Sequence, residues 1–214
     1  PIKNTNRRKI NRMMKKRYFA IPILAIALHF LLSNLLYFLV ERLVLDVFHI
    51  SPQQFMNHSY WGEILIYAVL ILVFFTLYKL LWRKEISEPR TATNFKDVLG
   101  SLVVGFGICG ISGLWIMLAE QLPSLQKSVE AMNAGAENIA GGNAFGTFMI
   151  AVIAAPIVEE ILFRGIVLRS MRKFAPAWAS ILISSVLFGV YHLNIVQAAY
   201  ATLMGIAAGI LYEK

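Results

Sequence analysis

The chain has 214 residues, of which 58% are hydrophobic and only 15% are charged, and its mean hydropathy is +0.64. This composition excludes a water-soluble domain, which needs a far more polar surface, and predicts a membrane protein whose main partner is the lipid bilayer. The formal net charge of +8 does not point to nucleic acid as a partner, because no fold able to read bases accompanies the basic residues.

Apolar segments suited to membrane-spanning helices, which need about 20 residues each, recur along the chain. They cover residues 19–40, 64–81, 98–122, 145–168, 177–191 and 195–211. The predicted fold class is therefore all-α, a polytopic transmembrane helix bundle of about six spans. Because Lys214 follows the last apolar run almost directly, we also expect the native chain to continue into one or more further spans.

The order of polar and apolar sequence divides the chain into four parts. They are a basic N-terminal arm at 1–18, three N-terminal transmembrane helices at 19–122, an outer loop at 123–144, and a C-terminal part with the charged motifs at 145–214. Small residues within two of the spans predict faces where helices pack closely. These residues are Gly105, Gly107, Gly110 and Gly113 in the third span and Ala201, Gly205 and Gly209 in the sixth.

Lysine and arginine gather in residues 3–17, 79–96 and 164–173, whereas the alternate connections carry little more than Arg42 and Lys127. This alternation follows the positive-inside rule with the N-terminus in the cytoplasm. It predicts a multi-pass protein of the cell membrane whose basic arm contacts anionic lipid.

Three charged residues, Glu159, Glu160 and Arg164, lie inside the fourth apolar segment. Each charge at the centre of a membrane helix costs roughly 2.5–3.5 kcal/mol, so such groups face a protein interior and usually have a function. Glu160 and Arg164 are four residues apart and can pair on one helix face. Arg164 would then position Glu160 and leave Glu159 free to act on water; the opposite assignment of the two carboxylates is equally compatible with the spacing.

Two further residues belong to this pattern. Pro156 lies one turn before the carboxylates, removes a backbone hydrogen bond and bends the helix. His192 follows Phe188 by four residues near the end of the fifth segment. Carboxylate and imidazole together are the minimum for activating water, directly or through a metal. His29 stands alone in the first span, and we expect it to be structural.

These motifs resemble the first two motifs of the CPBP family, which comprises CAAX proteases and bacteriocin-processing or self-immunity proteins. The matching residues are Glu159-Glu160-x-x-x-Arg164 and Phe188-x-x-x-His192, with Ala155-Pro156 and Phe163-Arg164-Gly165 beside them. The resemblance covers about residues 145–214, which it identifies as part of a CPBP-like catalytic domain.

The resemblance implies a CAAX-protease-like intramembrane endopeptidase acting on a peptide or membrane-protein substrate, in a bacterium for bacteriocin processing or self-immunity. Glu159 would activate the water, with Glu160 and Arg164 as its support and Pro156 and Phe188 in supporting places. His192 would stabilise the transition state or, in a metallo-endopeptidase, join Glu159 in holding zinc or another divalent metal.

One family motif is missing, because no histidine followed four residues later by Asn or Asp comes after His192. Either the chain continues into a span that carries it or the protein is catalytically incomplete, and we expect the former. The alternatives are a non-catalytic membrane immunity or regulatory protein and, less favoured, a transporter that uses buried Glu159 and Glu160 for ion passage. A transporter should show broken helices in both halves, but only the fourth segment contains a clear break.

Overall fold

A computed structural model describes residues 2–47, 49, 52–85, 94–140 and 144–214. The predicted all-α class is confirmed, because these residues form helices and short connections and contain no strand. In the labels below, η marks a π-helical segment. The elements are α1 (Ile2–Arg42), η1 (Leu43–Val47), α2 (Pro52–Trp82), α3 (Phe95–Glu120), α4 (Gln126–Ala140), α5 (Ala144–Thr147), η2 (Phe148–Ala154), α6 (Ala155–Glu160), η3 (Ile161–Leu168), α7 (Arg169–Met171), α8 (Ala177–Tyr191) and α9 (Ile195–Glu213).

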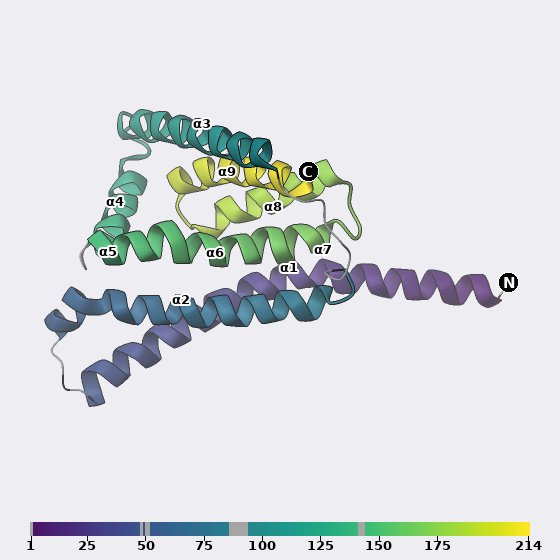
Figure 1. Ribbon diagram of the computed structural model, residues 1–214, viewed down its shortest axis with the longest axis horizontal. Helices are drawn as coiled ribbons and strands as arrows, with labels where there is room; N and C mark the ends of the chain where they lie inside the picture. Colours follow the sequence, from purple (N-terminus) through teal and green to yellow (C-terminus); the bar gives the residue numbers. More distant parts are fainter. Residues whose placement is uncertain (1, 48, 50–51, 86–93, 141–143) are drawn as a thin grey trace.

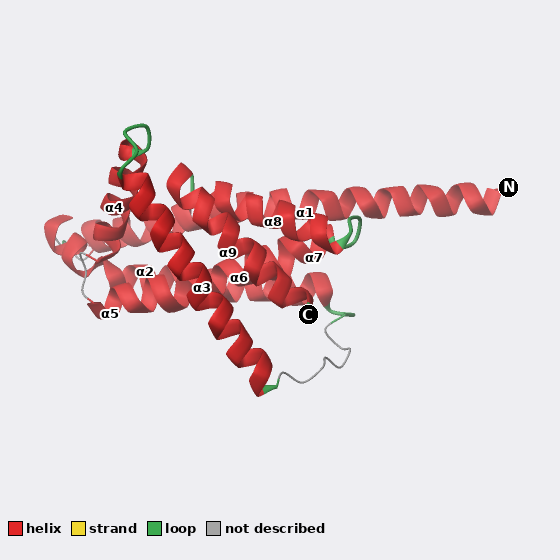
Figure 2. Cartoon of the chain, turned by 90° about the horizontal axis from the view of Figure 1, so that it is seen from above, coloured by secondary structure: helices red, strands yellow, loops and turns green. Residues whose placement is uncertain are grey.

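The helices form layers around the continuous helical stretch from α5 to α7 (Figure 1). On one side, α1 and α2 contact this stretch and each other, and on the other side α8 packs on η3 and α9 packs on α8. Figure 2 shows α3 crossing obliquely over α9, where the indole Nε1 of Trp115 donates a hydrogen bond to the carbonyl of Val196 at 3.0 Å. The stretch that carries the acidic motif is therefore covered from both sides.

Among the residues that the structure describes, four helices are long and apolar enough to cross a membrane, judged by length and composition. They are Tyr18–Val47, Tyr60–Trp82, Phe95–Glu120 and Ile195–Glu213. The fifth predicted segment coincides with α8, which is apolar but shorter. The fourth, predicted at 145–168, is helical throughout but switches between π and α hydrogen bonding rather than forming one α-helix. The chain is accordingly a multi-pass helical membrane protein.

The connection predicted as an outer loop, residues 123–144, contains a helix, α4. Val129 of α4 is buried in a small cluster with Ala119 and Val196, and the side-chain amide of Asn194 donates to the carbonyl of Ser128 at 2.8 Å. The proline and glycine residues of this stretch suggested a loop, but burial of one apolar side stabilises a helix there.

The main core lies where η3 meets α1 and α2. Leu162, Phe163 and Ile166 have no solvent exposure, and they pack with Leu70 and Phe74 of α2. This core fixes the turn of helix that follows the two glutamates.

Close packing by small residues is confirmed for the sixth predicted span and not for the third. A Cβ atom on Gly205 of α9 would lie 2.9 Å from the Cβ of Ser185, closer than real Cβ contacts come. In contrast, a Cβ on Gly105, Gly107, Gly110 or Gly113 of α3 would meet no described atom within 4 Å.

Candidate active site

The acidic motif lies at a change of helix type. Glu159 and Glu160 end the short helix α6, with π-helical η2 before it and π-helical η3, which holds Arg164, after it. Pro156, at the start of α6, has no N–H to donate to the preceding turn, so the predicted break appears here as a switch from π to α. π-Helical segments are rare in proteins and occur frequently at functional sites.

Side chains from neighbouring helices bind the backbone carbonyls of η3. Ser184 of α8 donates to the carbonyl of Phe163 at 3.1 Å, and the indole of Trp82 on α2 donates to that of Gly165 at 2.9 Å. In hydrocarbon, backbone groups need partners within the protein. These two hydrogen bonds satisfy such groups and hold η3 between α2 and α8.

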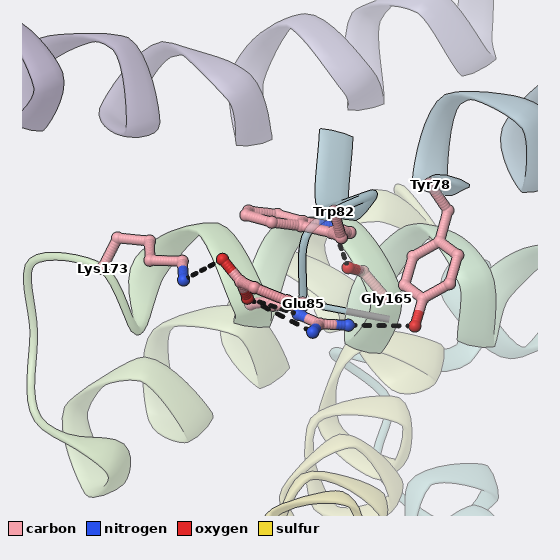
Figure 3. Close-up of polar contacts among 6 residues, drawn as sticks. Tyr78, Trp82, Glu85, Gly165 and Lys173 are labelled. Atoms are coloured by element: carbon pink, nitrogen blue, oxygen red, sulfur yellow. Dashed lines mark hydrogen bonds and ion pairs between the residues drawn. The ribbon is translucent and has the colours of Figure 1, made fainter. Parts of the chain in front are cut away.

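Charged residues fasten the end of α2 to α7 (Figure 3). The guanidinium of Arg169 donates to the hydroxyl of Tyr78 at 3.0 Å and lies 3.2 Å from the carboxylate of Glu85, which Lys173 also contacts. Burial alone would raise the pKa of Glu85, but the hydrogen bond and charge of Lys173 and the charge of Arg169 outweigh it and lower the pKa below its usual value. Together with Trp82 and Gly165, these residues anchor the helix that carries the acidic motif.

Arg164 is buried within the protein and does not face lipid. Only 3% of the residue is exposed, its Nη1 lies 3.2 Å from Oε1 of Glu160, and its Cζ lies 4.8 Å from the ring centre of Phe188. The contact with Glu160 is ionic, because Nη1 has no well-aligned hydrogen bond to any described residue. The pairing expected from the i,i+4 spacing is thus confirmed.

Glu159 is less exposed than Glu160 and has a different neighbourhood. Its charge acts on the hydroxyls of Tyr67 on α2 and Tyr191 on α8. Among the residues that the structure describes, no ion pair joins Glu159 to a basic side chain. The two adjacent carboxylates therefore differ in environment, one ion-paired and the other near phenol groups.

His192 caps the C-terminal end of α8 in a fixed orientation. Leu193 turns the chain sharply with φ of 55°, and the side chain of Asn194 then caps α9 by accepting from the amides of Val196 and Gln197. Nδ1 of His192 lies 2.9 Å from the carbonyl oxygen of Phe188. Because a carbonyl only accepts, Nδ1 must carry the proton, and in the neutral ring Nε2 keeps a free lone pair.

The ring of Phe188 joins the two motifs. It contacts the guanidinium of Arg164 on one side and the ring of His192 at 5.0 Å between centroids. Phe163 of the first motif also packs on Phe188, at 4.9 Å. The structure therefore brings the two motifs together through this ring, while the meeting of Glu159 and His192 on one water stays a prediction.

The described residues do not make a complete metal site. They contain no group of three or more His, Cys, Asp or Glu side chains that could hold an ion. A catalytic zinc usually has three protein ligands plus water, so Glu159 and His192 alone do not fit this requirement.

Sequence reasoning missed the residues around Tyr191. His29, which was expected to stand alone, is buried, and its Nδ1 lies 2.8 Å from the hydroxyl of Tyr191. Tyr191 directly precedes His192 in the sequence. The position of Tyr191 beside a motif histidine was a usable signal. Nothing local in the sequence connects it with His29, 162 positions away.

Comparison with known proteins adds one match. Residues 141–214 match the family model of the Rce1-like type II CAAX prenyl endopeptidases, a segment that includes both motifs. Neither curated proteins nor solved structures gave a match to the chain. The resemblance is thereby confirmed: the C-terminal part of this chain is similar in sequence to the Rce1-like CAAX endopeptidases, consistent with an intramembrane protease of the CPBP family.

Proposed function

We propose that this protein is an intramembrane endopeptidase that hydrolyses a peptide bond with water activated by Glu159. The observation that carries the proposal is the ring of Phe188, which contacts Arg164 of the acidic motif and His192 of the second motif. Such packing gives two motifs from different helices the fixed relative position that catalysis by several groups requires.

The proposed reaction assigns different work to the two carboxylates. Glu159 takes a proton from water while the water oxygen bonds to the substrate carbonyl carbon, and it passes that proton to the leaving amine as the C–N bond breaks. Glu160 is occupied by Arg164 and supports the site electrostatically. This division is favoured because Glu159 is the carboxylate without an ion pair among the described residues.

His192 is proposed to act through Nε2, since its Nδ1 proton is held by the carbonyl of Phe188. In the neutral ring Nε2 accepts a hydrogen bond and can orient the water. In the protonated ring it donates and can stabilise the negative oxygen of the tetrahedral intermediate. Since the described donors do not complete a metal site, we derive no step through a metal.

The proposed substrate is a peptide or membrane protein that reaches the site from the bilayer. The matched family takes its name from prenylated CAAX proteins, which are one candidate class. In a bacterium, processing of a bacteriocin leader or self-immunity is the setting we propose. The protein would lie in the cell membrane with its N-terminus in the cytoplasm, as the distribution of basic residues suggests.

A cleavage assay with matched variants tests the proposal. The full-length protein in liposomes is given an internally quenched peptide that ends in a farnesylated CAAX sequence, or a bacteriocin precursor peptide. Glu159→Gln keeps size but cannot accept the proton, so we expect cleavage to fall by roughly 10²- to 10⁴-fold with insertion unchanged. Full activity of both Glu159→Gln and Glu160→Gln would refute the glutamate mechanism. A parent protein that cleaves neither peptide would favour a non-catalytic immunity or regulatory protein.

A further inference from the structure

A polar pair links the first membrane span to the second motif. Nδ1 of His29 on α1 lies 2.8 Å from the hydroxyl of Tyr191 at the end of α8. His29 is only 6% exposed, and apart from Tyr191 the rings around it are those of Phe30 and Phe74. His29 thus packs on apolar rings, while the hydroxyl of Tyr191 also interacts electrostatically with Glu159 and Tyr67.

Tyr191 is in contact with residues of both motifs. Its ring meets the ring of Phe163 at 5.3 Å and the ring of His192 at 5.6 Å, in both cases edge to face. The charge of Glu159 acts on its hydroxyl. A movement of the Tyr191 ring would therefore disturb the imidazole of His192 and the surroundings of Glu159 together.

Stability alone gives little reason for this pair. A buried imidazole and a buried hydroxyl each lose hydration, so one hydrogen bond between them contributes only about 0.5–1.5 kcal/mol net. Two apolar side chains of similar shape would fill the same space at no net loss. Polar side chains within a membrane-embedded core usually mark a functional site.

We infer that His29 and Tyr191 form a positioning pair of the proposed active site, an inference that rests on the proposed function. The hydrogen bond between His29 and Tyr191 fixes the ring of Tyr191. That ring and the ring of Phe188 both pack on the imidazole of His192, with centroid distances of 5.6 and 5.0 Å. With Nδ1 bound to the carbonyl of Phe188, this packing leaves Nε2 one direction in which to act.

The pair can be tested with substitutions that change one feature each. Tyr191→Phe removes only the hydroxyl. His29→Leu and His29→Asn have nearly the same shape, but only Asn places a polar atom near the position of Nδ1. Tyr200→Phe is the control, because Tyr200 packs on the same core without belonging to the proposed site.

The readouts are kcat and KM of the full-length protein in liposomes on the quenched farnesylated CAAX peptide, per folded protein. Tyr191→Phe and His29→Leu are each expected to lower kcat about tenfold, the effect of one lost hydrogen bond, with KM unchanged. His29→Asn should retain more kcat than His29→Leu. The double variant Tyr191→Phe/His29→Leu should be no slower than either single variant, because both remove the same bond.

The outcomes separate this inference from the proposed function. If the parent cleaves, Glu159→Gln does not, and Tyr191→Phe and His29→Leu keep the parent kcat, the inference is overturned and the proposed function stands. Lower thermal stability with unchanged kcat of the folded protein would show a structural role only and would also overturn it. A parent that fails to cleave overturns the proposed function and this inference with it.

Discussion

Removing the charge of Arg164 should destabilise the protein, and the structure sets the size of the effect. Breaking a fully buried ion pair by removing one partner costs about 3–5 kcal/mol. Here Arg164 is buried, but the side chain of Glu160 is 52% exposed, so the carboxylate that is left can regain part of its hydration. We therefore expect Arg164→Ala to cost about 2 kcal/mol, including the lost contact with the ring of Phe188.

Three further variants separate charge from shape. Arg164→Lys keeps the charge but lacks the planar fork that reaches both Glu160 and Phe188, so it should recover only part of the stability. Arg164→Met keeps the stem without the charge. In the double variant Arg164→Met/Glu160→Gln no charge is left unpaired, and we expect stability close to that of the parent.

The assay is the fraction of detergent-solubilised protein that stays folded as temperature rises, measured for these four variants, for Glu160→Gln and for the parent. The double-mutant cycle then gives the interaction energy of Arg164 with Glu160 free of their separate effects. If Arg164→Ala and Arg164→Met melted with the parent, the ion pair would not be part of the stable structure and the reasoning would be refuted.

Three other predictions concern packing, pH and metal. Gly205→Ala should lower the melting temperature because its Cβ would lie 2.9 Å from that of Ser185, whereas Gly107→Ala, with open space around it, should not. The pKa of Glu85 is lowered in the folded protein, so its pairing stabilises the fold at pH values above the usual pKa of 4.5 and loses this effect as the pH falls through the lower folded-state pKa. A partly exposed pair of this kind contributes about 0.5 kcal/mol. The parent should therefore melt at a higher temperature than Glu85→Gln, and this difference should shrink below pH 4.5. Chelators distinguish the two roles given to His192: loss of cleavage that added zinc restores indicates a metal ligand, and cleavage that survives indicates direct stabilisation of the transition state.

The sequence predicts most helices because a change from apolar residues to proline or polar residues marks where they begin and end. The apolar run of α8 starts after Pro176 and stops at His192, and its predicted limits are the observed ones. The π-helical segments were not predictable in this way. In η3 nearly every side chain is apolar and buried, so hydrophobic periodicity, which needs a polar face for contrast, cannot distinguish one kind of helix from another.

The candidate site likewise contains one contact that the sequence predicts and others that it does not. The pairing of Glu160 with Arg164 follows from a spacing of four residues, and the structure contains it. Phe188 contacts Arg164, and Tyr191 contacts His29. Both contacts depend on how α8 packs against η3 and α1. No local pattern encodes such contacts between distant helices.

The burial of Arg164 depends on contacts from several elements. A guanidinium in an apolar core needs a counter-charge and a surface that tolerates it, and Glu160 and the ring of Phe188 provide these from two different elements. The carbonyls of η3 are bound by Trp82 of α2 and Ser184 of α8, so the segment that holds the charge is tied to both neighbouring layers. Arg164 forms its ion pair with Glu160, whereas the adjacent Glu159 takes part in none of the described ion pairs. Pairing one carboxylate with the buried guanidinium thus leaves a second carboxylate outside the described ion pairs, and Glu159→Gln and Glu160→Gln would distinguish the roles proposed for the two.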